Sequence, residues 1–256
     1  MITLPKINPK HETEKIVNFL KSVQKNTKIN KVVIGLSGGI DSTTVHYLLK
    51  KVYKPENIIG VSLDKEKIES LSNSLLKKSE SIKFFSTWEV RSEASTPTET
   101  KNFDTELLDN KIRLGNIMAR VRMIILFDLA KKYNALVCGT ENKSEQLLGY
   151  FTRYGDAASD IEPISHLYKN HVYQLAEYLN VPKKIINAKP TAGLWKNQTD
   201  EGEFGFTYKE ADIVLYLYYE KKMRAEKIRD LGLPNAKKII TRSLKNQFKH
   251  TVPYRV

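Results

Sequence analysis

Residues 32–49, VVIGLSGGIDSTTVHYLL, run from an apolar segment through a turn of small residues into a second apolar segment. The first segment predicts a buried strand, and the second predicts a helix because Val45, Leu48 and Leu49 recur at helical spacing. Glycines let a backbone approach an anion closely, and the free N–H groups of a helix N-terminus attract it. The turn therefore indicates a phosphate site, but the spacing fits an ordinary strand-to-helix turn with Asp41 as N-cap equally well.

The turn matches neither of the two common nucleotide motifs. A P-loop ends in a lysine followed by serine or threonine, and residues 32–49 contain no lysine. A dinucleotide fingerprint has the order G-x-G-x-x-G, whereas here the glycines are residues 35, 38 and 39. Because the carboxylate of Asp41 would repel phosphates, a phosphate site at this turn needs a cation between them.

Strand patterns alternate with longer helical patterns along the first part of the chain. The predicted strands cover residues 31–36, 58–63, 82–86 and 135–140. Helical periodicity covers residues 16–23, 45–52 and 114–129, and after residue 170 it predicts only helices, at 171–186, 207–222 and 234–248. This order predicts an α/β fold, with a parallel sheet, helices on both of its faces and a helical C-terminal part.

Length and composition limit the class of protein. At 256 residues the chain suits one large α/β domain, so we expect residues 1–256 to form a single domain. No apolar run approaches the roughly 20 residues of a membrane span, and the first residues lack the apolar core of a signal peptide. These features predict a cytoplasmic protein with no membrane partner. The lone Cys138 lies in an apolar run, so we expect a small core residue rather than a disulfide or a paired-cysteine metal site.

The net charge of +13 leaves the partner open. A basic protein can bind nucleic acid, an anionic membrane or a phosphorylated small molecule. Here the lysines are spread along the chain in pairs, which is more typical of solvated helix faces. The pairs are residues 50–51, 77–78, 131–132, 183–184, 221–222 and 237–238. Charge alone therefore does not predict a nucleic acid partner, and we expect none.

Two segments lack the patterns of regular structure. Residues 87–112 are polar, with Pro97 and many serines and threonines, and residues 188–206 carry several glycines and isolated aromatic side chains. Loops of this length within a compact domain are either mobile lids or poorly ordered insertions. We expect both segments to be flexible loops that close over a bound ligand.

Two further stretches place charged side chains near the expected ligand crevice. Arg120 and Arg122 are cations on the otherwise apolar helix at 114–129, where they either contact an anion or extend to solvent. A helix beginning near Asn142 would put Glu145 in its first turn, close to the end of the preceding strand. The helix dipole alone also favours an acid at that position.

The pattern SGGIDS at residues 37–42 resembles the pyrophosphate loop of the N-type ATP pyrophosphatases. Four more stretches occur in the order and spacing of ammonia-dependent NAD synthetase, namely GNIMAR (115–120), GTENKSE (139–145), YGDAASDIEPI (154–164) and KPTA (189–192). The resemblance covers about residues 10–255. It implies a Rossmann-like fold of the adenine nucleotide alpha hydrolase type.

The resemblance implies an enzyme that forms a C–N bond in two steps. ATP adenylates the nicotinate carboxylate of deamido-NAD and releases pyrophosphate, and ammonia then displaces AMP to give NAD. Mg²⁺ would lie between Asp41 and the phosphates and convert their repulsion into a bridge. ATP is then a co-substrate, and the expected assembly is a homodimer whose deamido-NAD site is partly built by the second subunit.

The family's metal and ATP residues can be matched to this chain motif by motif. Asp41 and Glu145 match the two metal carboxylates. Asp41, Asp156, Lys169 and Thr191 match the residues implied in catalysis, with Lys169 and Thr191 placed where charge develops on the phosphates. The implied ATP-binding set is Gly35, Leu36, Ser37, Gly38, Gly39, Ile40, Asp41, Ser42, Thr140, Lys169 and Thr191.

The resemblance also implies a deamido-NAD site. Asp156 and Asp160 match acids at the ammonia and nicotinate end, where a carboxylate can hold ammonium and accept its proton. Arg153 stands where the family often has lysine, which preserves a phosphate contact. The implied deamido-NAD set is Arg120, Tyr150, Arg153, Asp160, Phe248 and Lys249.

The chain departs from the family pattern at several positions. Phe248 stands where histidine is common, and Gly193 stands where an acid is common. Residues 60–71, GVSLDKEKIESL, lack the expected proline- and aspartate-rich pattern, and residues 87–112 show no match. These departures affect the deamido-NAD contacts, the loop after KPTA and the adenine and dimer contacts.

Two other functions stay open. A tRNA-modifying member of the same superfamily would suit the basic charge, although a sulfur-inserting type needs paired cysteines and a lysidine-forming type would not explain GTENKSE. A non-catalytic, nucleotide-binding member would suit the departures at Gly193 and Phe248. The leading hypothesis is an NAD synthetase that takes free ammonia, because the chain has no room for a glutaminase domain and Cys138 lies in a predicted strand. Delivery of ammonia by a separate partner stays open.

Overall fold

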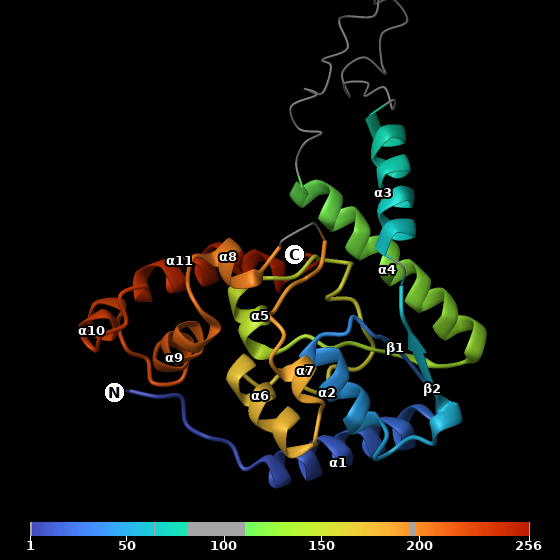
Figure 1. Cartoon of the computed structure of the whole chain (residues 1–256), viewed down its shortest axis with the longest axis horizontal. Helices are drawn as coiled ribbons and strands as arrows, with labels where there is room; N and C mark the ends of the chain where they lie inside the picture. The colour runs from blue at the N-terminus through green and yellow to red at the C-terminus, as the bar shows by residue number, and fades with distance from the viewer. Residues whose placement is uncertain (1, 64, 81–110, 195–197, 256) are drawn as a thin grey trace, which may run out of the picture.

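Three parallel strands form a sheet inside the molecule (Figure 1). The computed structural model describes residues 2–63, 65–80, 111–194 and 198–255. β1 (Val32–Gly35) lies between β2 (Ile58–Val61) and β3 (Leu136–Cys138). The register pairs Val32 with Ile58 on one side and with Leu136 on the other. Three of the four predicted strands are thus confirmed, each shorter than predicted, and the strand predicted at 82–86 lies outside the described residues.

Helices account for most of the remaining structure. In chain order these elements are α1 (Pro9–Thr27), α2 (Ile40–Leu49), the 3₁₀ turn η1 (Pro55–Asn57), α3 (Lys65–Glu80), α4 (Lys111–Tyr133), α5 (Lys143–Leu148), α6 (Lys169–Tyr178), α7 (Lys183–Ile186), α8 (Asp200–Phe204), α9 (Tyr208–Tyr219), α10 (Ala225–Asp230), α11 (Ala236–Asn246) and the 3₁₀ turn η4 (Gln247–Lys249).

The side chains of β1 alternate between the two faces of the sheet. Val32 and Ile34 belong to a core built with α1, α2 and α6. Val33 belongs to a second core on the opposite face, together with Ala130 of α4 and Val137 of β3. Helices therefore cover both faces, which is why β1 is apolar at every position and fully buried from Val32 to Ile34. The predicted fold class is confirmed.

The C-terminal part is helical, as predicted. α5, α9, α10 and α11 share a core of their own that lies beside the sheet (Figure 1). Phe204, Val214 and Ile239 are among its buried members. The helix predicted at 171–186 is divided into α6 and α7 because Asn180 adopts a left-handed backbone (φ 57°) and Pro182 cannot donate to a helical hydrogen bond.

The segment 188–206 is not irregular throughout. Residues 200–204 form α8, whose N-cap Thr199 accepts a hydrogen bond from Gly202 N. Phe204 is 2% exposed and stacks on Phe206 with ring centroids 5.3 Å apart. The prediction of a loop is therefore wrong for these residues, because burial of two aromatic rings fixes a stretch that has no helical period. Of the segment 87–112, residues 111 and 112 open α4 and the others lie outside the described residues.

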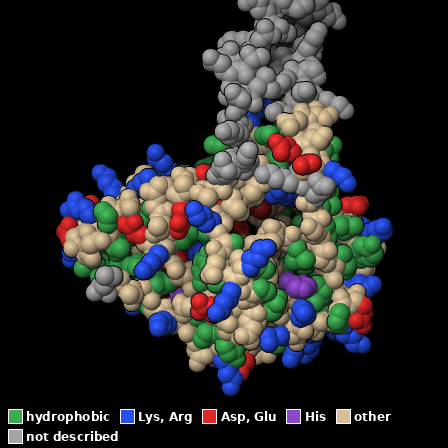
Figure 2. Space-filling view, viewed as in Figure 1, with side chains coloured by type: hydrophobic (Ala, Val, Ile, Leu, Met, Phe, Trp, Pro, Cys, Tyr) green, Lys and Arg blue, Asp and Glu red, His purple; other side chains and the backbone are tan. Residues whose placement is uncertain are grey.

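The surface agrees with the dispersed lysine pattern. Figure 2 shows Lys and Arg side chains scattered over the visible face, with acidic side chains between them. No helix in the described parts of the chain has both the length and the apolar character that a bilayer span requires.

Candidate active site

The turn between β1 and α2 is supported by its own serines. Gly38 has φ +78°, which glycine adopts without strain. Ser37 Oγ accepts a hydrogen bond from Gly39 N at 3.2 Å and lies 3.1 Å from Ser42 Oγ. Gly39 is the N-cap of α2, so the interpretation of Asp41 as N-cap is wrong and Asp41 lies in the first turn. The carboxyl end of β1 therefore meets a glycine-rich helix N-terminus, which is a suitable anion site.

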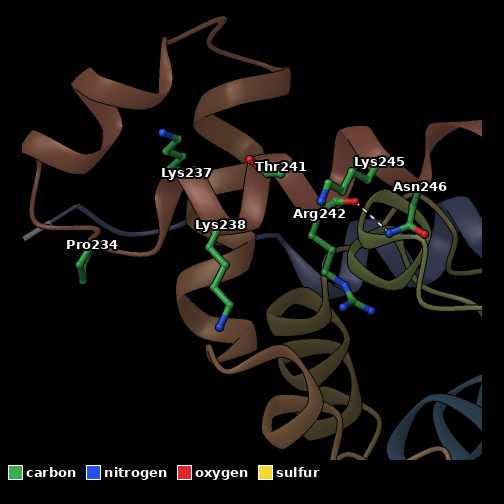
Figure 3. A pocket seen from close by; sticks show the side chains of 7 residues that line it. All are labelled: Pro234, Lys237, Lys238, Thr241, Arg242, Lys245 and Asn246. Atoms are coloured by element: carbon green, nitrogen blue, oxygen red, sulfur yellow. Dashed lines mark hydrogen bonds between the residues drawn. The ribbon is translucent and has the colours of Figure 1, made fainter.

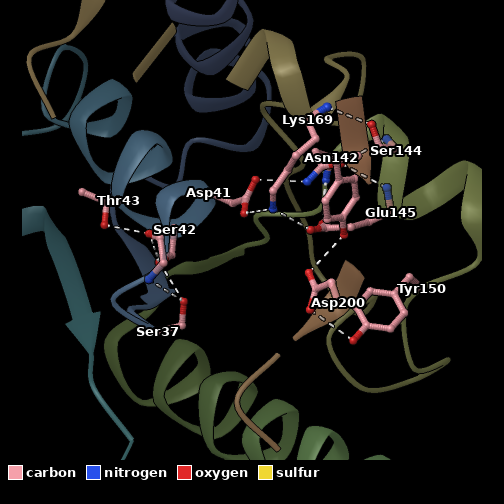
Figure 4. Close-up of polar contacts among 12 residues, drawn as sticks. Ser37, Asp41, Ser42, Thr43, Asn142, Ser144, Glu145, Tyr150, Lys169 and Asp200 are labelled. Atoms are coloured by element: carbon pink, nitrogen blue, oxygen red, sulfur yellow. Dashed lines mark hydrogen bonds and ion pairs between the residues drawn. The ribbon is translucent and has the colours of Figure 1, made fainter. Parts of the chain in front are cut away.

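Three charged side chains from three helices meet beside this turn (Figure 4). Lys169 Nζ lies 2.6 Å from Asp41 Oδ2 and 3.0 Å from Glu145 Oε1. Lys169 is the first residue of α6 and is 2% exposed, while each carboxylate keeps 17% of its side-chain surface exposed. Sequence reasoning named all three residues, and the structure joins them in one cluster.

Asn142 connects the two carboxylates. Its side chain accepts hydrogen bonds from Ser144 N and Glu145 N as the N-cap of α5, which confirms the predicted helix start. Its Nδ2 donates to Asp41 Oδ1 at 3.0 Å, and its backbone N donates to Glu145 Oε2 at 3.3 Å. The capping motif was readable in the sequence, but the bond to Asp41 was not.

The electrostatics of the cluster follow from burial and mutual attraction. Burial acts to lower the pKa of Lys169, but the two carboxylates outweigh it and raise the pKa above its ordinary value. Burial raises the pKa of Glu145, and the nearby ammonium limits the rise. Lys169 therefore stays charged at neutral pH.

The donor set fits a divalent cation that is shared with phosphates. Asp41 and Glu145 each direct one oxygen at a common point, and hard carboxylate oxygens are the ligands that Mg²⁺ prefers. Within the described residues, no three or more His, Cys, Asp or Glu side chains gather closely enough to hold a metal by themselves. Mg²⁺ sites with only one or two carboxylates usually take substrate phosphates as further ligands.

A buried carboxylate beneath the cluster links two helix starts. Asp212 on α9 is 0% exposed, and its Oδ1 accepts from Ser144 Oγ at 2.5 Å. Its Oδ2 accepts from Asn170 N at 2.8 Å and from Asn170 Nδ2 at 2.7 Å. Lys169 N in turn donates to Ser144 Oγ at 2.8 Å. Sequence reasoning missed Asp212, although a single acid within the apolar stretch ADIVLYL was a usable signal.

α8 attaches to the cluster through Asp200. This residue is 3% exposed and accepts hydrogen bonds from Tyr150 OH at 3.2 Å and from Tyr208 OH at 3.1 Å. The Lys169 ammonium lies 5.1 Å from the centre of the Tyr208 ring. Tyr150, which was expected at the deamido-NAD site, therefore binds α8 in this structure.

The two predicted threonines are placed differently. Thr140 lies two residues after the last residue of β3 and is half-buried. Thr191 is exposed, and its Oγ1 accepts a hydrogen bond from Gly193 N at 3.0 Å. The described contacts do not join Thr191 to Asp41 or Lys169.

Three of the residues expected to bind deamido-NAD lie together. Arg120 Nε donates to the backbone oxygen of Arg153 at 3.3 Å, and the Arg153 guanidinium lies 5.2 Å from the Phe248 ring centre. Lys249, next in the chain, donates to the carbonyls of Gly149 at 2.6 Å and Phe151 at 3.0 Å. Phe248, one of the departures, thus supplies an apolar surface that supports a cation.

The two predicted aspartates have different partners. Asp156 Oδ1 accepts from Thr152 N at 2.9 Å, and its side chain is reached by solvent. The protein around it nevertheless raises the pKa of the Asp156 carboxyl by desolvation. Asp160 Oδ2 instead accepts a hydrogen bond from Val137 N at 2.8 Å and so stabilises β3.

A further acid near this end was not singled out from the sequence. Glu141 Oε1 is buried without a hydrogen-bond partner, and burial raises the pKa of this carboxyl to about 9. Its backbone N donates to Glu162 Oε2 at 3.1 Å. Burial likewise raises the pKa of Glu162, to about 7. Residues 137–164 contain several acids, which was a usable signal, but periodicity does not reveal which of these acids are buried.

A separate groove of about 620 Å³ runs along α11 (Figure 3). It is lined by Pro234, Lys237, Lys238, Thr241, Arg242, Lys245 and Asn246. None of the predicted site residues lines it, and it contains no carboxylate. The Arg242 guanidinium lies 4.6 Å from the Phe204 ring centre and 5.8 Å from that of Tyr150. The groove is therefore basic, and it lacks the acids that the predicted chemistry requires.

Comparison with known proteins agrees with this geometry. The profile of the NAD synthase family matches residues 12–253. The NH(3)-dependent NAD(+) synthetase of Thermococcus sibiricus is 39% identical over 242 residues, which cover 93% of this chain and 94% of the relative.

Solved structures of related synthetases are also similar to this chain. An NMN synthetase from Francisella tularensis has a TM-score of 0.73 at 29% identity, covering 98% of this chain and 99% of its own. The NH3-dependent NAD synthetase of Campylobacter jejuni has a TM-score of 0.69 at 30% identity, covering 98% and 100%. The resemblance inferred from the motifs is confirmed: this chain belongs to the NAD synthase family.

Proposed function

We propose that this protein converts deamido-NAD to NAD with ammonia, at the expense of ATP, through an adenylated nicotinate carboxylate. The observation that carries this proposal is the cluster of Asp41, Lys169 and Glu145 beside the 37–42 turn. It places a buried cation and two metal-type carboxylates next to a helix N-terminus suited to phosphate. Family membership supplies the substrate class.

The turn would hold the β- and γ-phosphates, which leave as pyrophosphate. Mg²⁺ held by Asp41 and Glu145 would neutralise charge that develops as the bond between the α- and β-phosphates breaks. Lys169 and Thr191 would donate to the phosphates, and Thr140, two residues after β3, would contact ATP. The carboxylate oxygen of the substrate takes the α-phosphoryl group, and pyrophosphate is the leaving group.

The other end of the site would bind deamido-NAD. Arg120, Arg153 and Lys249 provide positive charge for its phosphates, and Phe248 offers a flat apolar surface. Asp156 would hold ammonium and accept its proton, since only neutral ammonia can attack the adenylate. Desolvation raises the pKa of this carboxyl above its ordinary value, which makes it a better proton acceptor than a free aspartate. Tyr150 and Asp160 complete the proposed set.

Free ammonia is the nitrogen source in this proposal. A glutaminase needs a reactive nucleophile, and Cys138 is 2% exposed within β3. Burial raises the pKa of this thiol well above its ordinary value, which leaves it protonated and unreactive.

The test is a turnover assay with deamido-NAD, ATP, Mg²⁺ and ammonium chloride, reading NAD and pyrophosphate together. Both products should form in equal amounts, and glutamine should not replace ammonium. The deamido form of NMN belongs in the same assay because one similar structure is an NMN synthetase. Absence of both NAD and pyrophosphate would end the proposal, and a salt-dependent shift with tRNA would favour a tRNA-modifying function instead.

The proposed assembly is a cytoplasmic homodimer with no nucleic acid or membrane partner. Large apolar side chains are exposed on α3 and α4, namely Leu71, Leu75, Ile112 and Ile124, with exposed fractions from 43% to 64%. Burial of exposed apolar side chains is a common reason for dimer formation. Sedimentation of the wild type and of Ile124→Glu tests it: the wild type should be dimeric and the variant shifted towards monomer.

A further inference from the structure

The ammonium of Lys169 lies at the point where the two metal-type carboxylates converge (Figure 4). Its distances to Asp41 Oδ2 and Glu145 Oε1 are 2.6 Å and 3.0 Å, and the side chain is 2% exposed. Two cations cannot share a buried position between the same two oxygens, because their repulsion there is poorly screened. We refer to this position as the cation seat.

Each carboxylate presents one oxygen to Asn142 and the other to Lys169. Asp41 Oδ1 accepts a hydrogen bond from Asn142 Nδ2, and Glu145 Oε2 accepts one from Asn142 N. The remaining oxygens, Oδ2 and Oε1, are the two that bind Lys169. A metal ion that binds both carboxylates through Asp41 Oδ2 and Glu145 Oε1 must therefore replace the ammonium.

The backbone from which Lys169 projects is anchored. Lys169 N donates to Ser144 Oγ, and the next residue, Asn170, is held by Asp212 through two hydrogen bonds. Replacement of the ammonium in the seat therefore requires movement of the lysine side chain, which has a flexible four-carbon stem, and not of the helix.

A displaced ammonium needs a new anionic partner, because a buried charge left unpaired is strongly disfavoured. Phosphates at the 37–42 turn provide one, and α2 carries both this turn and Asp41. We propose that Lys169 makes the metal site conditional on ATP: in the free enzyme its ammonium fills the cation seat, and the divalent ion enters only with the nucleotide, whose phosphates take over the ammonium. This inference rests on the proposed function.

Mn²⁺ alone is the probe, titrated by calorimetry into protein with and without α,β-methylene ATP. The wild type should bind Mn²⁺ at least tenfold more weakly without the nucleotide analogue than with it. Lys169→Met empties the seat and should bind Mn²⁺ without nucleotide at least tenfold more tightly than the wild type. Lys169→Arg keeps a cation in the seat and should behave as the wild type does in the absence of nucleotide.

Thermal unfolding gives a second reading that does not depend on activity. Lys169→Met leaves two carboxylates facing each other, so it should unfold at a lower temperature and regain part of the loss with Mn²⁺ alone. The matched control is Lys143→Met, which removes an ammonium that pairs with Glu220 on the surface. This control, like the wild type, should show no rise with Mn²⁺.

Equal Mn²⁺ affinity of the wild type and Lys169→Met without nucleotide would overturn the proposal. If Lys169→Met does not fold, the wild type alone provides the test. Tight binding of Mn²⁺ to the wild type without the nucleotide analogue would likewise overturn the proposal. NAD formation is measured separately. An active wild type that binds Mn²⁺ freely refutes only this inference, whereas an inactive wild type whose Lys169→Met variant gains Mn²⁺ binding refutes only the proposed reaction.

Discussion

Asp212 on α9 accepts a hydrogen bond of 2.5 Å from the hydroxyl of Ser144 on α5. The same carboxylate binds Asn170 at the start of α6. Glu145 follows Ser144 in the chain, and Lys169 precedes Asn170. One fully buried carboxylate therefore sets the spacing between two of the three charged groups of the site.

We predict that Asp212→Asn lowers kcat by 10- to 100-fold, the effect typical of a residue that orients a ligand group. The amide has one oxygen to accept the three hydrogen bonds that the carboxylate accepts, so the starts of α5 and α6 lose their fixed spacing. KM for deamido-NAD should change little because none of the residues proposed to bind it contacts Asp212. Steady-state kinetics at saturating ATP and Mg²⁺ measure the effect.

Two further variants separate positioning from general stability. Ser144→Ala removes the hydroxyl that donates to Asp212. The double variant should therefore lose no more activity than the worse of the two single variants. Ser243→Ala removes an equally buried hydroxyl that binds Leu147 O at 2.6 Å, away from the cluster. It should lower the unfolding free energy by about 1–2 kcal/mol with kcat unchanged. Additive losses in the double variant would contradict the positioning role.

Asp41→Asn should strongly reduce the rate of pyrophosphate release while the protein stays folded. The amide can still accept from Asn142 Nδ2, but it offers no charge to a divalent ion or to Lys169. Loss of one such electrostatic group costs about 10²–10³ in rate. Phosphate detection with added pyrophosphatase measures the rate, and circular dichroism checks the fold. Asp230→Asn, at an exposed surface pair, is the control that should keep full activity.

Glu141→Gln should stabilise the protein increasingly as pH rises. Because the folded-state pKa of Glu141 is raised to about 9 from an ordinary 4.5, the folded state keeps a proton that the unfolded chain has lost. The contribution of Glu141 to wild-type stability therefore decreases as pH rises from about 4.5 to 9. Glutamine does not titrate and so avoids this loss. The unfolding free energy of Glu141→Gln should therefore exceed that of the wild type by an amount that grows by up to about 1.4 kcal/mol per pH unit.

Urea unfolding of the wild type and Glu141→Gln at pH 6, 7 and 8 measures the difference. Glu162, whose pKa is raised to about 7, titrates in both proteins and so largely cancels from the comparison. A difference that is constant across the three pH values would show that Glu141 is ionised in the folded protein.

Gly149→Ala should be much more destabilising than Gly232→Ala. Both glycines have left-handed backbones, with φ +62° and +86°, so both variants carry a backbone cost of about 1–2 kcal/mol. A Cβ at Gly149 would collide with Asn246 of α11, whereas a Cβ at Gly232 meets open space. Overpacking adds about 1–3 kcal/mol at Gly149 alone. Denaturant midpoints measured at constant m-value test this, and equal losses would show that α11 adjusts freely.

Several features of the site could be read from short stretches of sequence. The 37–42 turn, the start of α5 at Asn142 and the place of Glu145 in its first turn depend on glycine freedom and helix capping. Both are properties of neighbouring residues, so spacing along the chain was sufficient. The interpretation of Asp41 as N-cap was wrong because α2 begins two residues earlier, with Gly39 in the extended backbone of the N-cap.

Other features depended on residues that are distant in sequence. Asp212 and Asp200 were missed because an acid in a helix normally faces water, and their burial follows only from how α8 and α9 pack. α8 itself forms where no helical period exists, since Phe204 finds aromatic partners in the C-terminal core. The segment 188–206 therefore could not be predicted from composition.

Hydrophobic periodicity, the glycine-rich turn and the order of the sequence motifs were sufficient to predict the α/β class, the family and the three charged residues Asp41, Glu145 and Lys169, which the structure brings together. They could not reveal that an ammonium already fills the position between Asp41 and Glu145, because those contacts span 128 and 24 residues of chain. Loss of solvent and mutual attraction set the charge and the occupancy of that position. Both exist only after distant helices have packed together, so they are properties of the folded protein.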